Sequence, residues 1–498
     1  MSETATTKRF YPTLLIMIGA SIVLIASVAG FVNAFTMDSS MAGLVMPARS
    51  SSVTDPLHGM PLSHMPEMFL AAAGLVFVAL GAVLRSGAKR MPLPETRTGR
   101  RGRVVIAVIG TAALTVDISK TSTLGFVIPG MRAEYGLSAG TASFLAVAGL
   151  AGTAAGAILI GFLTDRIGRR SAYLIATLGF TATAMCGSMP NFAANLVMCA
   201  LMGLAVGGLA PLLITLLTDV VGGRSKGSIV VALSITATAL GYLAASGSAL
   251  WLEPTFGWRV LWLIGAPTGV LLALLSPWVP NSAVPRTKET VQRTRPPLPE
   301  QTFTSGLQRT YAVLIGVLTF GLTTWVPSLA RLGGVPVATA NLLLTVAAVV
   351  MVPCALLLMV TYRRFGPTFV GAGLAGVTAV LLLVLTASGA VATISWAAAG
   401  ALVAALFSVN IMAAVFLPIA ADLSDPGGRG RATGTVSLFN RLGGLCGPLL
   451  LAGLVSSATD VLVAVAALAV LCAGAAWYIG RRRRELLKTT KELEKAAK

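Results

Sequence analysis

Long apolar runs dominate this sequence and restrict what it can fold into. They alternate with short loops that hold most of the charged residues. A helix needs about 20 apolar residues to cross the hydrocarbon core of a bilayer, and most of these runs are long enough. Only 11% of the residues are charged, whereas soluble domains carry about 25%. The sequence therefore predicts an all-α protein that crosses a membrane many times.

The apolar runs fall into three groups, and together they predict about 14 spans. Two leading spans cover about 11–35 and 68–84. A basic linker follows, and then six spans at about 104–130, 140–163, 171–189, 192–218, 228–251 and 259–279. After a polar, Pro-rich stretch, six more spans lie at about 310–330, 338–360, 367–387, 392–420, 431–455 and 460–480.

The basic residues predict the orientation of these spans. Lys and Arg concentrate in every second loop, including the linker before residue 104 and the tail that begins at Arg481. Such residues favour the cytoplasmic side, so we expect both termini in the cytoplasm, in a multi-pass protein of the cytoplasmic (inner) membrane surrounded by the lipid bilayer. The net charge of +19 is then explained by basic residues in the cytoplasmic loops. Nucleic acid is excluded as a partner, because no basic face with interleaved aromatic residues is present.

One charged loop identifies a family. The loop Gly161-Phe-Leu-Thr-Asp-Arg-Ile-Gly-Arg-Arg170 resembles the loop between the second and third helices of the major facilitator superfamily, and Tyr362-Arg-Arg-Phe-Gly366 is a weaker copy in the last group of spans. The resemblance implies two six-helix bundles related by an internal repeat, with two additional N-terminal transmembrane helices. It also implies a conformational latch, with charge that only sets topology as the alternative. The latch residues are Gly161, Asp165, Arg166, Gly168, Arg169 and Arg170.

Further motifs resemble the sugar and aromatic-acid proton symporters of this superfamily. Gly203-Leu-Ala-Val-Gly-Gly208 is similar to their fourth helix, although Cys199 stands where an arginine is common, so no proton relay is carried over to this helix. Gly257-Trp258-Arg259 resembles the start of their sixth helix. Arg431-Ala-Thr-Gly434, leading to Asn440-Arg441-Leu-Gly-Gly444, resembles their eleventh. The resemblance implies proton symport of a small organic solute.

The spans and loops divide the chain into five predicted parts. Residues 1–103 hold the two additional helices, an external loop with Met and His, and a basic cytoplasmic linker. Residues 104–280 form an N-terminal six-helix bundle, and residues 281–308 form a cytoplasmic linker. Residues 309–480 form the C-terminal six-helix bundle, and residues 481–498 form a basic cytoplasmic tail.

Asp117 is the strongest candidate for a functional side chain. It lies about 13 residues into its span, near the middle of the membrane, where a charge is costly and usually functional. Ser119, Lys120 and Thr121 follow it and are expected to belong to the same substrate- and proton-handling site. Lys120 can share the helix face of Asp117 and partly neutralise it. Burial and a nearby cation act on a carboxyl pKa in opposite directions, so Asp117 is expected to couple proton and substrate. A structural ion pair is the alternative.

The second bundle offers further candidates. Arg441 and Asn440 lie about 10 residues into their span and are expected to contact substrate or act as a gate. A helix-packing ion pair, with Asp117 as its candidate partner, is the alternative for Arg441. Asn410 and Trp325 are weaker candidates to face the cavity in which substrate would bind. Polar side chains in membrane helices often only hydrogen-bond one helix to another. Lys120 and Arg441 are two cations deep in the spans, and Asp117 is the one deep anion. This excess of positive charge favours an anionic substrate such as a carboxylate.

These observations predict a secondary active transporter that moves a small organic anion and protons by alternating access. Uptake by symport is favoured over efflux of drugs or metabolites by proton antiport, because residues 228–250 lack the Gly-Pro step that is usual in exporters of the family. No nucleotide-binding or catalytic motif is present, so neither an enzyme nor a cofactor is expected. A monomer is expected, and a membrane sensor on a transporter scaffold is the alternative from another class.

The first external loop suggests one more alternative. His58, Met60, His64 and Met65 lie close together in it, and imidazole and thioether groups bind copper, especially Cu(I). A transporter related to copper or another metal is therefore a second hypothesis. A loop whose methionines face the membrane, with no metal, is the simpler interpretation.

Overall fold

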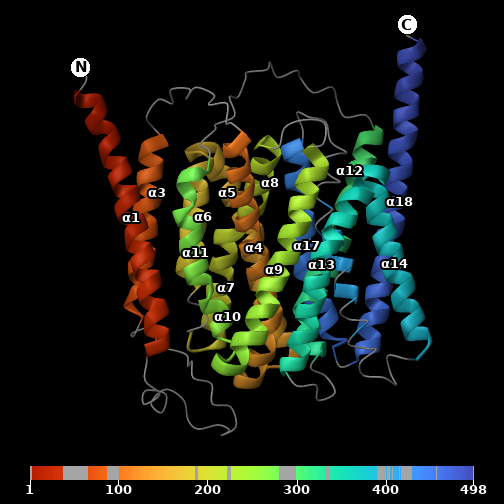
Figure 1. The fold of residues 1–498 in the computed structure, drawn as a ribbon, viewed down its shortest axis with the longest axis horizontal. Helices are drawn as coiled ribbons and strands as arrows, with labels where there is room; N and C mark the ends of the chain where they lie inside the picture. Colours follow the sequence, from red (N-terminus) through yellow and green to blue (C-terminus); the bar gives the residue numbers. More distant parts are fainter. Residues whose placement is uncertain are drawn as a thin grey trace. The chain divides into compact units, whose positions relative to one another are not determined.

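The computed structural model of the chain describes most of its helices (Figure 1). It covers residues 3–36, 65–86, 100–184, 189–220, 226–279, 299–330, 337–389, 400, 404–406, 408–413, 416, 429–455 and 457–496. Within these ranges the chain is helical and contains no strand. The all-α prediction is confirmed.

The helices are labelled as in Figure 1. Their bounds in the N-terminal half are α1 Glu3–Thr36, α3 Pro66–Ser86, α4 Arg100–Tyr135, α5 Ala139–Ile167, α6 Arg169–Thr183, α7 Phe192–Val206, α8 Leu209–Val220, α9 Lys226–Phe256, α10 Val260–Leu263, α11 Gly265–Leu274 and η4 Ser276–Trp278. In the C-terminal half they are α12 Pro299–Ala330, α13 Val337–Phe365, α14 Pro367–Ala387, α17 Arg429–Ala452 and α18 Ala458–Ala496.

Among the described residues, 11 helices are long and apolar enough to cross a membrane by length and composition. The predicted span at 171–189 appears as α6, which has 15 residues. The predicted span at 392–420 lies mostly outside the described residues. The count of about 14 spans therefore stays a prediction.

The chain forms two compact units. Unit 1 comprises Met1–Val221 and Gly241–Ala283, and unit 2 comprises Gly222–Leu240 and Val284–Lys498. The predicted N-terminal bundle and both additional helices fall mainly in unit 1, and the predicted C-terminal bundle falls in unit 2. Helix α9 contributes residues to both units. Each unit is described by itself below.

The two additional helices form a hairpin that packs on the first bundle. Helices α1 and α3 lie side by side (Figure 1), and a Cβ at Gly19 would lie 2.5 Å from the carbonyl oxygen of Gly74. Such glycines let helix backbones approach closely in a membrane, where van der Waals packing drives association. The hairpin presents Val23 and Val78 to Leu178 of α6 in a shared apolar cluster. The first bundle therefore carries this hairpin on its α6 side.

Glycines also set the closest helix pairs inside each unit. In unit 1, a Cβ at Gly203 of α7, or at Gly207 directly after its end, would overlap the backbone of α5. In unit 2, a Cβ at Gly316 of α12 would overlap the backbone of α17, and one at Gly443 of α17 would overlap that of α12. These pairs therefore depend on residues without side chains.

We expect Gly203→Ala to destabilise the protein by about 1–3 kcal/mol, because the new methyl group overpacks the α5–α7 contact. Gly247→Ala is the matched control, because nothing lies within 4 Å of a Cβ at that helical position. Thermal unfolding of the purified protein measures both. Equal unfolding temperatures for the two variants would contradict the close α5–α7 packing.

Candidate functional site

Asp117 lies in the middle of α4, a helix of 36 residues. At 1.5 Å per residue, it is about 25 Å from either end of the helix. Its side chain is half-buried, and its backbone oxygen accepts a hydrogen bond from the Thr121 hydroxyl at 3.1 Å. The backbone oxygen of Ser119 likewise accepts a hydrogen bond from Thr123 at 2.8 Å. Asp117 thus lies at the middle of α4, while its depth in a membrane and its role in coupling stay predictions.

Lys120 is directed at the backbone of another helix. Its side chain is only 2% exposed, and its Nζ donates to the carbonyl oxygen of Leu261 in α10 at 3.1 Å. A Cβ at Gly265, the first residue of α11, would lie 3.3 Å from the Lys120 Cε. The ammonium group therefore lies at the junction of α10 and α11. The sequence did not predict this contact.

The candidates in unit 2 also bind backbone carbonyls. Asn440 of α17 donates from Nδ2 to the oxygen of Ala312 in α12 at 3.1 Å, and Trp325 of α12 donates from Nε1 to the oxygen of Pro448 in α17 at 2.8 Å. Both therefore join α12 to α17. Asn410 donates to the oxygen of Leu406 in its own helix at 2.9 Å.

Arg441 is half-buried in α17, next to Asn440. It belongs to unit 2, and Asp117 belongs to unit 1. The proposed pairing of these two side chains, and their sharing of one cavity, stay predictions.

The predicted latch forms a tight turn between α5 and α6. Helix α5 ends at Ile167, Gly168 adopts φ 91 and ψ 161, and α6 begins at the next residue. The guanidinium of Arg166 lies over the Phe162 ring, with Cζ 4.1 Å from the ring centroid. The side chain of Asp165 is outside the described part of the chain, so its predicted contacts remain untested.

The weaker copy of this motif has the same backbone turn. Gly366 adopts φ 84 and ψ 170 between α13 and α14, close to the values at Gly168. This region of φ and ψ is essentially restricted to glycine. The repeat inferred from the sequence is therefore visible in the backbone, even where the side chains of the two loops differ.

We expect Gly168→Ala and Gly366→Ala to lower stability by about 1–3 kcal/mol each, because alanine is strained in this conformation. Gly373→Ala in α14, where nothing lies within 4 Å of a new Cβ, is the control. Thermal unfolding again provides the measurement. A neutral Gly168→Ala variant would show that the turn does not need a glycine.

The predicted metal loop is only partly described. His58, Met60 and His64 lie outside the described residues, and Met65 is 1% exposed. The backbone oxygen of Met65 accepts a hydrogen bond from the Met68 nitrogen at 3.1 Å, at the start of α3. Within the described ranges, no group of three or more His, Cys, Asp or Glu residues could hold a metal ion. The copper hypothesis therefore gains no support from Met65.

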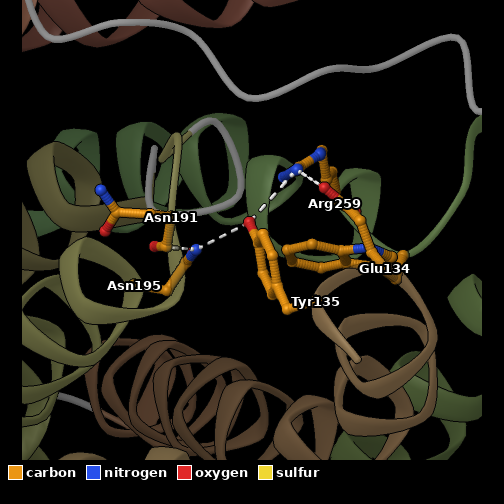
Figure 2. Close-up of polar contacts among 6 residues, drawn as sticks. Glu134, Tyr135, Asn191, Asn195 and Arg259 are labelled. Carbon is orange, nitrogen blue, oxygen red and sulfur yellow. Dashed lines mark hydrogen bonds and ion pairs between the residues drawn. The ribbon is translucent and has the colours of Figure 1, made fainter. Parts of the chain in front are cut away.

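A polar cluster at one end of unit 1 was missed by the sequence analysis (Figure 2). Arg259, only 1% exposed, forms an ion pair with Glu134 at the end of α4. Its Nη2 also donates to the Tyr135 hydroxyl at 3.3 Å. The Trp258 Nε1 donates to the second carboxylate oxygen of Glu134 at 2.8 Å. Asn195 of α7 donates to the Tyr135 hydroxyl at 3.4 Å.

This cluster joins the end of α4 to the starts of α7 and α10. The start of α7 is itself fixed by Asn191, whose Oδ1 accepts a hydrogen bond from the Ala194 nitrogen at 2.8 Å. The Glu134–Arg259 ion pair could have been suggested by the sequence. Glu134 and Arg259 carry opposite charges at span ends that the predicted topology places on the same side of the membrane.

We expect Glu134→Gln to destabilise the protein by about 1–3 kcal/mol, because it leaves the buried Arg259 guanidinium without its carboxylate. Glu485→Gln is the control, because the Arg481–Glu485 pair is exposed and such pairs contribute about 1 kcal/mol or less. Chemical or thermal unfolding of both variants tests this expectation. A loss at Glu134 no larger than that at Glu485 would contradict it.

Comparisons with known proteins identify the family, and the family model matches the chain in two ranges, as an internal repeat would produce. A family model for the Major Facilitator Superfamily matches residues 110–415 and 334–497. The crystal structure of a D-xylose–proton symporter superposes with a TM-score of 0.62 at 18% identity, covering 75% of this chain and 97% of that one. That likeness concerns the fold.

Two relatives are similar over part of their length. The niacin transporter of Acinetobacter baylyi (strain ATCC 33305 / BD413 / ADP1) is 28% identical over 167 residues, 33% of this chain and 38% of that protein. A gallate transporter of Pseudomonas putida is 29% identical over 181 residues, 36% of this chain and 40% of that protein. The chain thus spans less than half the length of these curated relatives. Because the family model covers well over half of the chain, the protein belongs to the major facilitator superfamily.

Proposed function

We propose that this protein is a secondary active transporter that takes up a small organic anion by proton symport with alternating access. The observation that carries the proposal is Asp117, a half-buried carboxylic acid at the middle of a membrane-spanning helix. Ionisable groups at that depth usually belong to substrate or proton pathways. Membership of the major facilitator superfamily gives this acid a transport scaffold.

The substrate class is supported by chemistry and by the relatives. Niacin and gallate, the molecules named for two similar transporters, are both aromatic carboxylates. Arg441, half-buried in α17, is a guanidinium that can bind a carboxylate through two parallel hydrogen bonds. We therefore propose an aromatic or similar small carboxylate as the substrate. Arg441 and Asn440 are proposed contacts.

In the proposed cycle, Asp117 carries the proton. Protonation neutralises the acid, which removes a repulsive charge from the path of an anionic substrate. The two bundles then expose the site to the other side, where substrate and proton leave. The glycine-dependent turn at Gly168 would act as the conformational latch on the cytoplasmic face. Both termini, with the basic loops, would lie on that face.

We expect Asp117→Asn to abolish accumulation driven by a proton gradient while leaving substrate exchange intact, because the amide cannot carry the proton. Labelled gallate and niacin in proteoliposomes, with the pH gradient set on either side, measure accumulation, exchange and direction. Asp460→Asn, at an exposed acid in the first turn of α18, is the control and should behave as wild type.

A variant that still concentrates substrate with the pH dependence of the wild type would remove Asp117 from the coupling mechanism. Accumulation only when the vesicle interior is the more acidic side, with release from preloaded vesicles when the exterior is acidic, would instead favour efflux by proton antiport.

A further inference from the structure

The segment between α9 and α11 is a short, buried connection with a break at each end. Gly257 has a positive φ of 75, which ends α9, and helix α10 then lasts only four residues. A turn at Ile264 separates α10 from α11. Leu261 and Trp262 are each 1% exposed, so the segment lies inside unit 1. Such a segment has little regular helix of its own to fix its position.

Contacts with α4 hold this segment at two places, one near the end of α4 and one near its middle. Near the end of α4, Arg259 forms an ion pair with Glu134 (Figure 2). Trp258 also donates to Glu134, and a Cβ at Gly130 would lie 2.5 Å from the Trp258 ring. Near the middle of α4, the Lys120 Nζ donates a hydrogen bond to the Leu261 carbonyl oxygen at 3.1 Å. The two contacts lie 14 residues apart on α4, which is about 21 Å of helix.

In the Lys120–Leu261 contact, a charged ammonium group donates to a backbone carbonyl close to the break between α10 and α11. Carbonyls at the end of a helix lack regular partners, and hydrogen bonds from charged groups are stronger than neutral ones. A buried ammonium group also needs such acceptors, since its desolvation is costly. The contact therefore benefits both groups. It joins the α10–α11 junction to α4 within one turn of Asp117.

This geometry separates two roles for Lys120. A substrate ligand would direct its ammonium group to the transported anion, whereas here at least one of the three ammonium donors is given to the protein backbone. The close approach of Gly265 to the Lys120 Cε shows that the junction is shaped around the lysine side chain.

We propose that Lys120 is a positioning residue that fixes the α10 segment to the middle of α4, so that the helix carrying Asp117 and the α10–α11 junction move together. This inference rests on the proposed transport function for its role in the cycle. The contact itself is testable without transport.

The first test is hydrogen–deuterium exchange of residues 257–265 in the purified protein. Lys120→Met, which keeps the length but removes charge and donor, should speed exchange in this segment about tenfold. Gly265→Ala should do the same with the lysine intact, because its Cβ would lie 2.8 Å from the Ala184 Cβ and displace the junction. Thr123→Val is the matched control, because in the described part of the chain its hydroxyl bonds the backbone oxygen of Ser119 in its own helix and no other helix.

The second test is uptake of labelled gallate or niacin by the same variants. A positioning residue predicts a lower maximal rate with an unchanged KM for Lys120→Met, and the same pattern for Gly265→Ala. A substrate ligand predicts a raised KM for Lys120→Met only. That result, or exchange in 257–265 that stays at the wild-type rate, would overturn the proposal.

The two tests fail in distinguishable ways. Wild-type protein that moves neither substrate, while Lys120→Met still loosens residues 257–265, would contradict the proposed function and leave the positioning contact standing. Normal transport by the wild type, with no change in exchange for either variant, would contradict the positioning contact alone.

Discussion

The scarcity of water inside a membrane is the constraint on which this structure depends. A polar group there must find its partner within the protein. Lys120, Asn440 and Trp325 each meet this need by donating to a backbone carbonyl of a neighbouring helix. These three polar side chains therefore act first as connections between helices. Any role in transport has to be compatible with these contacts.

Close packing through glycine is the second requirement. The hairpin of α1 and α3, the α5–α7 pair and the α12–α17 pair all have glycines where a Cβ would meet a neighbouring backbone. Van der Waals contact between backbones replaces the hydrophobic effect, which has little force between helices in lipid. Each unit thus contains tightly joined pairs. Such pairs suit a mechanism in which bundles move as bodies.

The internal repeat connects fold and function. Gly168 and Gly366 adopt nearly the same glycine-only conformation at corresponding turns, although the acidic residue of the first motif has no counterpart in the second. The two turns thus share backbone geometry although their side chains differ. The Glu134–Arg259 ion pair lies on the other predicted side of unit 1. In unit 1 the turn joins α5 to α6, and the ion pair joins α4 to the residue before α10.

The sequence by itself determined the membrane class, the helical fold and the repeat, because these follow from apolar length and local motifs. Only the tertiary structure decided the partner of Lys120 and the Glu134–Arg259 ion pair. Each of these contacts joins residues more than 100 positions apart. Helix periodicity shows which residues share a face but not which helix that face meets, so such contacts depend on packing.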